Sequence, residues 1–486
     1  MSLIHCNIKK KKSYKVKRFW PLRPNLNIVR HYIITQQKEN KISDRTIQTF
    51  TALLDKIKCA IASLPNLEKS PWSSLEMACP EIAPHFMELL TSSLFPLCYF
   101  KSRNGQEEVI AMGSWQELDN CATSELIASF PKLTIIYKTP FSNKSPCSAE
   151  WSLFTQHSAY LPIMLFFKQK NNYSLKIQFN DNLSQTNELL EQCCTKIEEA
   201  LCSTCSQKNI PLLPTSQTQE EIPTLFTWNI IIKKVLQALE DKFLSKVVLA
   251  RKQLINYDTP LDPLTFLDKV QSKNDHSYLF FYAPKQGHAF ISKTPERLFW
   301  QNKNILEVDA IAGTRLRGDT PEEDTRLAAE LLSSAKELAE HRIVTQTIKK
   351  KLELICADIQ LTECEQINKL NYVQHIRSQF KGLLLPKIDP VSIINLLHPT
   401  PAVGGDPQEI ACQYINELEP FERGLYAAPV GIISQNQSEV IVGIRSILID
   451  GQQLHIFGGA GIVAGSTGIA EWKEITAKMN NFLNLL

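Results

Sequence analysis

Strand-like segments follow one another in the second half of this 486-residue chain, and helices do not separate them in regular alternation. Each segment is rich in β-branched and aromatic residues and ends at turn residues; the six are KVVLARKQLI, YLFFYAP, HAFIS, LEVDAIAG, EVIVGIRSILID and QLHIFGGAGIV. Strict alternation of strands and helices would indicate a doubly wound parallel sheet, whereas runs of strands favour an α+β fold. We therefore expect an α+β protein.

Helical patterns surround these strands. Periodic apolar residues predict helices over residues 185–205 and 228–241. Thr320 is followed by proline and, three residues on, by Glu323, a capping box that predicts the start of a long helix. A last helix is expected from about Ile469 to the C-terminus.

The formal net charge of +3 is unevenly distributed along the chain. Ten of the 53 basic residues precede Glu39, the first acidic residue, so the remainder has 43 basic against 50 acidic residues and a charge of −7. We expect a flexible basic extension over residues 1–38. The acidic balance of the remainder argues against a nucleic-acid-binding surface.

Composition also bears on the cellular compartment. The chain has 13 cysteines, an odd number, and no apolar stretch of a secretory signal follows the basic N-terminus. These features predict a reducing, cytoplasmic location. No apolar run approaches the roughly 18 residues of a transmembrane helix, so no membrane association is expected. No segment predicts an obligate protein partner.

Glycine is concentrated where chemistry is expected. Fifteen of the 17 glycines lie at or after Gly287, and glycine is needed where a backbone turns sharply or approaches a ligand closely. We therefore expect a scaffold over residues 39–205, a polar, proline-bearing connector over 206–226 and a catalytic region over 227–486.

The segment GGAGIVAGSTG, residues 458–468, is predicted to lead from a strand into a helix. Its free N–H groups would attract a carboxylate or phosphate. A purely structural turn is the alternative.

Two predicted helices carry acidic pairs. Glu337 and Glu340 are three residues apart, and Glu471, Glu474 and Lys478 also share one helix face. Carboxylates on two facing helices could hold Mg²⁺, which prefers oxygen ligands and keeps several waters. Two solvated helix faces are the alternative.

A lysine and a glutamate are candidates for proton transfer. Lys246 precedes the apolar residues VVLA, and Glu296 lies in TPERLF. Burial disfavours the charged forms of both groups, which would leave a lysine able to accept a proton and a glutamate able to donate one. Alternatively, Lys246 caps its strand in water and Glu296 forms a surface ion pair with Arg297.

Taken in order, the segments resemble the chorismate-utilising enzymes, and most closely the isochorismate synthases. The resemblance runs from about residue 227 to the C-terminus; besides the Glu-x-x-Glu-x-x-x-Lys ending it comprises KVVLAR, TPERLF, AIAGTRLRG, SAKELAEHRIV, LHPTPAVGG, ERGLYAAPVG, VGIRSIL and GGAGIVAGS. Anthranilate and aminodeoxychorismate synthases usually have glutamine where Lys246 stands, and the latter use a lysine where this chain has Ala312. Salicylate synthases usually have threonine in place of Ala402.

The resemblance implies one large domain in which two antiparallel sheets, flanked by helices, stack around the site. It implies Mg²⁺-dependent conversion of chorismate to isochorismate, by attack of water at C2 with loss of the C4 hydroxyl. The product would supply menaquinone, siderophore or salicylate biosynthesis. A salicylate synthase, which also eliminates pyruvate, and a non-catalytic anion-binding protein are the alternatives.

The resemblance also assigns residues. Lys246 would be the base and Glu296 the acid; Glu340 and Glu474 would bind Mg²⁺ directly, and Glu337 and Glu471 through water. The remaining substrate-binding set would be Gly313, Thr314, His375, Ala402, Tyr426, Arg445, Gly459, Ala460, Gly461 and Lys478.

Overall fold

The computed structural model describes Asp55 and Cys59 and residues 71–79, 86–91, 94–142, 148–203, 216–271, 276–369 and 373–483. The predicted basic extension, residues 1–38, and residues 206–215 of the predicted connector lie outside the described residues.

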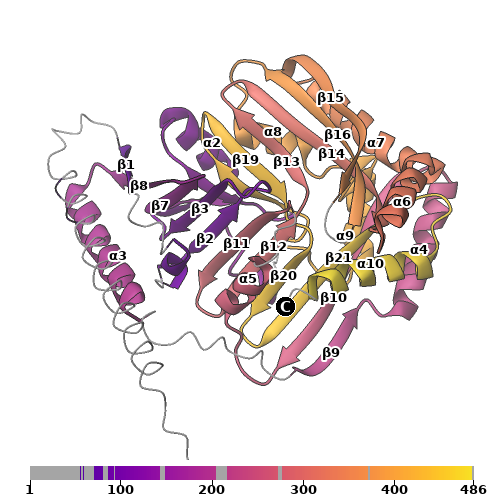
Figure 1. Ribbon diagram of the computed structural model, residues 1–486, viewed down its shortest axis with the longest axis horizontal. Helices are drawn as coiled ribbons and strands as arrows, with labels where there is room; N and C mark the ends of the chain where they lie inside the picture. The colour runs from indigo at the N-terminus through magenta and orange to yellow at the C-terminus, as the bar shows by residue number, and fades with distance from the viewer. Residues whose placement is uncertain are drawn as a thin grey trace, which may run out of the picture.

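Two antiparallel sheets form the centre of the molecule (Figure 1). Within the described residues, the larger sheet has twelve strands. Its order is β1 (Trp72–Ala78), β8 (Asn172–Asn180), β7 (Met164–Gln169), β3 (Glu107–Met112), β2 (Leu97–Lys101), β11 (Tyr278–Lys285), β12 (His288–Thr294), β20 (Ser446–Asp450), β21 (Gln453–Ile462), β10 (Lys246–Tyr257) and β17 (Gly405–Asp406), and β9 (Ser216–Ile222) also pairs with β10.

The smaller sheet has nine strands among the residues described. Its order is β15 (Cys356–Lys369), β16 (Val373–Leu384), β14 (Ile305–Leu316), β13 (Arg297–Asn302), β19 (Gln437–Val442), β18 (Pro429–Ile433), β5 (Ile135–Lys138), β6 (Ala159–Leu161) and β4 (Gln116–Leu118). Strands from both halves of the chain therefore share each sheet, and β2 pairs directly with β11.

Helices flank the sheets, as expected. Their bounds are α2 (Asn120–Ser129), α3 (Leu183–Ser203), α4 (Leu225–Glu240), α5 (Pro263–Gln271), α6 (Pro321–Ser333), α7 (Ala335–Leu352), α8 (Pro390–Leu397), α9 (Gln408–Leu418) and α10 (Gly468–Leu483). The predicted α+β fold with two stacked antiparallel sheets is confirmed.

The chain passes between the sheets at two adjacent crossovers. Pro295 and Glu296 connect β12 in the larger sheet to β13 in the smaller one, and residues 443–445 connect β19 back to β20. The crossovers are hydrogen-bonded to each other: the Val442 N–H donates to the Glu296 carbonyl (3.1 Å), and the Lys293 N–H donates to the Arg445 carbonyl (3.1 Å).

Three predicted elements differ from the structure. The helix that starts at Thr320 breaks at Ser334, because the Ser334 hydroxyl accepts from the Glu337 N–H and caps a new helix, α7. The strand expected over residues 439–450 is split by the second crossover. Residues 216–222 of the predicted connector form β9, which pairs with β10.

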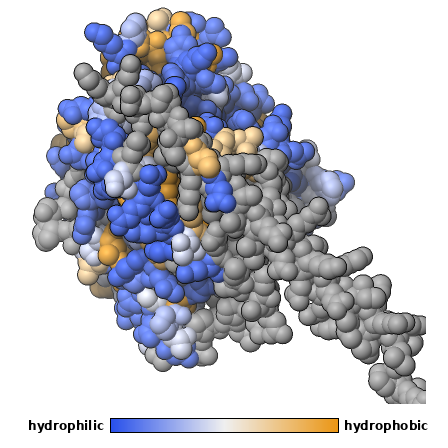
Figure 2. Space-filling model, turned by 90° about the vertical axis from the view of Figure 1, so that its left-hand side faces the viewer, coloured by the Kyte–Doolittle hydropathy of each residue, from blue (hydrophilic) through white to orange (hydrophobic). Residues whose placement is uncertain are grey.

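One face of the molecule is mainly hydrophilic (Figure 2). Where Figure 2 shows described residues, hydrophilic ones predominate, and hydrophobic ones form small scattered groups. Among the helices of the described ranges, none combines the length and the apolar character that a bilayer crossing requires.

Trp151 anchors the core where the two halves of the chain meet. Its side chain is fully buried against Phe154, Phe290 and Phe457, and its indole N–H donates to the Glu422 carbonyl at 3.0 Å. The backbone at Gly424 (φ +53°) passes so closely over this ring that an added Cβ would lie 2.0 Å from Trp151.

Replacing Gly424 by alanine should therefore destabilise the protein strongly. Gly451→Ala is a matched control, because Gly451 also has positive φ (+65°) but open space around it. We expect the control to cost about 1 kcal/mol for its backbone conformation. Gly424→Ala should cost at least about 2 kcal/mol more, since overpacking adds to the same backbone cost. If Gly424→Ala and Gly451→Ala have equal free energies of unfolding in urea, the Trp151 side chain can move to accept the added methyl group at no cost, which would contradict the prediction.

Candidate active site

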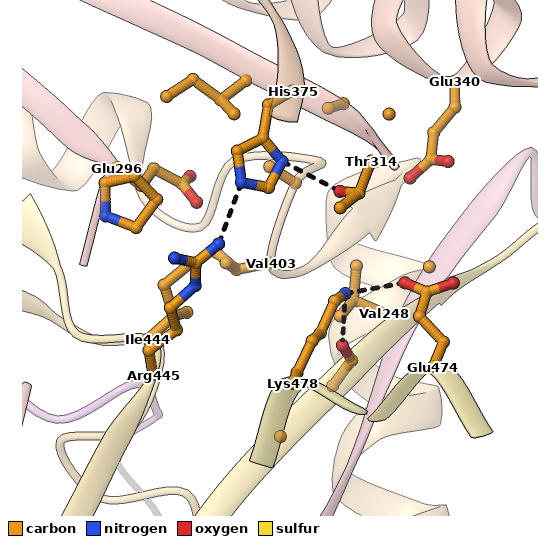
Figure 3. Close-up of a pocket in the computed structure, with 18 of the residues that line it drawn as sticks. Val248, Glu296, Thr314, Glu340, His375, Val403, Ile444, Arg445, Glu474 and Lys478 are labelled. Atoms are coloured by element: carbon orange, nitrogen blue, oxygen red, sulfur yellow. Dashed lines mark hydrogen bonds and ion pairs between the residues drawn. The ribbon is translucent and has the colours of Figure 1, made fainter. Parts of the chain in front are cut away.

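The predicted site residues lie around one cavity of about 160 Å³. Its walls come from β10, β14, β21, α7, α10 and both crossovers. All predicted site residues line it except Ala460. Figure 3 shows Glu296, His375 and Arg445 on one side, and Glu340, Glu474 and Lys478 on the other.

Glu296, the predicted acid, lies at the first crossover and is only 6% exposed. The pKa of its carboxyl is raised to about 7, because burial and, less strongly, the Asp309 carboxylate outweigh the lowering by Lys246, Lys478 and Arg445. The neighbouring Arg297 is directed away from it, toward Glu307 and Asp309 (each 3.1 Å). The alternative of a surface pair between Glu296 and Arg297 is therefore wrong.

Lys246, the predicted base, starts strand β10 and is 1% exposed. The alternative of a water-exposed strand cap is therefore wrong. Its ammonium nitrogen Nζ donates to Oε1 of Glu340 at 2.7 Å. The contact holds the Lys246 side chain against an acidic residue of the cavity wall.

Each of the four predicted carboxylates faces one cation. The pairs and their N···O distances are Glu337 with Arg315 (3.5 Å), Glu340 with Lys246 (2.7 Å), Glu471 with Lys336 (3.6 Å) and Glu474 with Lys478 (2.7 Å). Burial raises the pKa of Glu337 and of Glu471, whereas Lys478 lowers that of Glu474. All four carboxylates line a shared cavity. The alternative of two solvated helix faces is therefore wrong for Glu337, Glu340 and Glu471, whereas the Glu474 side chain is 45% exposed.

The fit to Mg²⁺ rests on two carboxylates rather than four. Over the described ranges, no group of three or more His, Cys, Asp or Glu side chains is arranged to hold a metal ion. Mg²⁺ commonly binds one or two carboxylates and keeps its other waters. Glu340 and Glu474, from α7 and α10, suit that mode, provided that Lys246 and Lys478 release them.

His375 connects two other predicted residues. Its Nε2 lies 2.9 Å from an Arg445 guanidinium nitrogen, and its Nδ1 lies 3.0 Å from the Thr314 hydroxyl (Figure 3). Arginine can only donate, so Nε2 is the acceptor and Nδ1 carries the proton. Burial and then Arg445 hold the pKa of His375 well below its usual value. His375 is therefore a neutral side chain that orients Arg445.

The first five residues of the glycine-rich segment, 458–462, belong to strand β21 rather than to a loop. Gly459, Ala460 and Gly461 pair with β10. Gly461 and Gly459 lie opposite Val248 and Ala250, whose N–H groups donate to Gly404 and Glu419 on the far edge of β10 and not to β21. These are therefore non-hydrogen-bonded pairs of the ladder, in which the N–H and C=O groups of both glycines point away from β10. Ala460 bonds within the ladder and lies outside the cavity, so its prediction as a lining residue was wrong.

These glycines are needed for close approach. A Cβ on Gly461 would lie 2.8 Å from both the Glu340 carboxylate and Lys246 Cε, and one on Gly459 would lie 2.6 Å from the Tyr426 hydroxyl. Lys478 Nζ also donates to the Gly459 carbonyl at 3.1 Å. The glycines therefore leave room for the neighbouring side chains and expose backbone groups, as predicted, but they do so from a strand.

The sequence analysis missed several lining residues. Arg315 and Lys336, which pair with the acidic side chains, each adjoin a predicted site residue in the sequence, and that adjacency was the available signal. The apolar lining residues Val248, Val403 and Ile444 gave no signal of their own. In the sequence, these apolar residues cannot be distinguished from residues of the hydrophobic core.

Comparison with known proteins identifies the family. The family model described as "Chorismate binding enzyme" matches residues 62–486. The chain belongs to the chorismate-binding enzymes. The resemblance inferred from the motifs is thereby confirmed, and it extends well into the N-terminal half.

Several relatives within this family are isochorismate synthases. The chloroplastic enzyme of Catharanthus roseus is 33% identical over 353 residues, which are 71% of this chain and 61% of the relative. MenF of Haemophilus influenzae is 31% identical over 395 residues, 81% of this chain and 87% of the relative. This chain thus spans less than two thirds of the plant relative.

A solved structure shows the same fold. The menaquinone-specific isochorismate synthase MenF of Escherichia coli superposes with a TM-score of 0.79 at 25% identity, covering 90% of this chain and all of the other. The arrangement of sheets and helices in this chorismate-binding enzyme is therefore that of MenF.

The raised pKa of Glu296 predicts a pH-dependent contribution to stability. Between the unfolded value near 4.5 and the folded value of about 7, the unfolded chain holds fewer protons, so this group's stabilisation is lost as pH rises through that window. Glu296→Gln removes the effect. The variant should gain up to about 3 kcal/mol relative to wild type between pH 5 and pH 7.5. A difference in unfolding free energy that stays constant with pH would contradict the shift.

Proposed function

We propose that this protein is an isochorismate synthase that interconverts chorismate and isochorismate. The observation that carries the proposal is one cavity in which a buried lysine and a buried glutamate of raised pKa lie on different walls beside four carboxylates. Relatives that are about a third identical and named isochorismate synthases support it.

The chemistry needs a base and an acid at the two ends of one allylic displacement. Lys246 takes a proton from water as the oxygen bonds to C2, both double bonds of the ring diene shift by one position, and the C4–O bond breaks. Glu296 gives its proton to the departing hydroxide, so that one water enters and one leaves. Lys246 lies against Glu340, across the cavity from Glu296, which suits this division of roles.

Chorismate is a dianion, and the cavity offers cations for both carboxylates. Arg445, oriented by His375, and the Tyr426 hydroxyl would hold the enolpyruvyl carboxylate, since a guanidinium can donate two parallel hydrogen bonds. Gly313, Thr314 and Lys478 would face the ring carboxylate. Mg²⁺ held by Glu340 and Glu474, with Glu337 and Glu471 acting through water, would supply positive charge there.

The small side chain of Ala402 lines the cavity beside Val403. Salicylate synthases usually have threonine here, so Ala402 supports a reaction that stops at isochorismate. The menaquinone route is favoured as the destination of the product, because the E. coli relative with the same fold is menaquinone-specific. A cytoplasmic location and the absence of an obligate protein partner stay predictions of the sequence.

The first test is a product assay. Purified protein would be incubated with chorismate, with Mg²⁺ or with EDTA, and the products separated by chromatography. Isochorismate formed only with Mg²⁺ and without pyruvate supports the proposal. Salicylate with pyruvate would make the protein a salicylate synthase, and no turnover would reject both activities.

Lys246→Ala should abolish turnover while chorismate still binds. An acid–base group typically contributes about 10²–10⁴-fold to the rate, so the variant should retain less than about 1% of wild-type kcat. Lys252→Ala is the control, since Lys252 is a buried, ion-paired lysine on the same strand that does not line the cavity. Residual activity above this level would remove Lys246 as the essential base.

Glu474→Gln should raise the Mg²⁺ concentration needed for half-maximal activity by about tenfold or more, because one carboxylate ligand is lost. Titration of Mg²⁺ at saturating chorismate measures this. Glu322→Gln, near the start of α6 and outside the cavity, controls for a general change in acidity. An unchanged Mg²⁺ requirement would exclude Glu474 from the metal site.

A further inference from the structure

A buried ion pair lies directly behind the cavity and is not among its lining residues. Arg423 and Glu419 are 4% and 8% exposed, and two guanidinium nitrogens of Arg423 donate to the Glu419 carboxylate at 2.6 and 2.8 Å. The Arg423 guanidinium also lies 4.3 Å from the centre of the Phe141 ring. A desolvated pair is costly unless further hydrogen bonds satisfy it, so its other contacts matter.

The pair fills a gap along one edge of strand β10, between the residues that pair with β17 and those that pair with β9. Strand β17 pairs with β10 only at Lys246 and Val247, and the Gly404 carbonyl then accepts from the Val248 N–H at 2.7 Å. From the Val248 carbonyl to the Ala250 N–H, the hydrogen bonds of this edge are made by the ion pair. The Arg423 guanidinium donates to the Val248 carbonyl at 2.8 Å, and the Glu419 carboxylate accepts from the Ala250 N–H at 2.7 Å. Two side chains thus replace a neighbouring strand.

The same guanidinium also fixes a second wall. Arg423 donates to the Val403 carbonyl at 2.8 Å, next to Ala402. Its own carbonyl accepts from the N–H of Tyr426 at 2.8 Å, which closes the turn that presents the tyrosine. Val248, Ala402, Val403 and Tyr426 all line the cavity, and Figure 3 shows Val248 and Val403 there.

We propose that Arg423 and Glu419 form a positioning pair that sets the separation of the Val248, Val403 and Tyr426 walls around the substrate ring. This role rests on the proposed isochorismate synthase activity. Neither side chain contacts the reacting atoms. The pair acts through backbone carbonyls and an N–H group of three segments that come from distant parts of the sequence.

The test is the steady-state kinetics of Arg423→Met, which removes the charge and every donor but keeps the length of the side chain. Because a displacement of about 1 Å can cost about 10²-fold, we expect kcat/KM for chorismate to fall by about that factor. A substantial part of the loss should be in KM, since the three walls contact bound substrate. Arg423→Lys, which keeps the charge and can restore one bond, should recover part of KM.

Lys252→Met is the matched control. It breaks another buried ion pair of β10, with Glu150 at 2.9 Å, without touching a lining residue. If Arg423 only stabilises the fold, both variants lose kcat in proportion to folded protein and keep the wild-type KM. That result overturns the proposal.

Glu419→Gln decides the matter if Arg423→Met does not fold, because it preserves shape and removes only the charge. A several-fold rise in KM supports the positioning role, and an unchanged KM rejects it. Wild-type protein without any turnover of chorismate would reject the proposed function and this role with it. An active wild type beside variants with normal KM would reject the role alone.

Discussion

The site depends on the two hydrogen-bonded crossovers that join the sheets. Each crossover places one functional residue, Glu296 on the first and Arg445 on the second, and the bonds between them fix both backbones. Arg445 has a left-handed conformation (φ 49°), which is unfavourable for a side chain of its size, and its carbonyl is held by the Lys293 N–H. Glu296 and Arg445 therefore belong to one hydrogen-bonded unit.

The N-terminal half contains a second pair of crossovers with the same connections. Residues 113–115 lead from β3 to β4, and Pro162 and Ile163 lead from β6 back to β7. The Trp115 N–H donates to the Leu161 carbonyl at 2.9 Å, and the Ile163 N–H donates to the Met112 carbonyl at 3.2 Å. Here Ile163 packs against Gly113 rather than leaving a polar space. Chain topology alone thus does not make a site; the side chains at the crossover do.

Charge balance governs the other side of the cavity. Four carboxylates and four cations meet in pairs, so their charges compensate each other without a ligand. A divalent cation together with a dianionic substrate would keep that balance, whereas either one alone would disturb it. The same pairing ties Lys246 to Glu340, so in the proposed function metal binding and release of the base would involve one carboxylate.

The sequence by itself determined much of this protein. The runs of strands predicted the α+β class, the capping box at Thr320 placed the start of α6, and the motifs supplied 15 of the 25 residues that line the cavity. These signals are local, because strand patterns, caps and motif spacing are carried by neighbouring residues.

Only the tertiary structure decided the rest. The break at Ser334 and the split of residues 439–450 put Glu337 and Arg445 at the ends of elements that looked continuous, since periodicity does not show where a chain changes sheet. The pairing of Lys246 with Glu340 joins residues 94 positions apart, and Arg423 reaches Val248 across 175. Such contacts follow from how the sheets stack, and no local pattern encodes them.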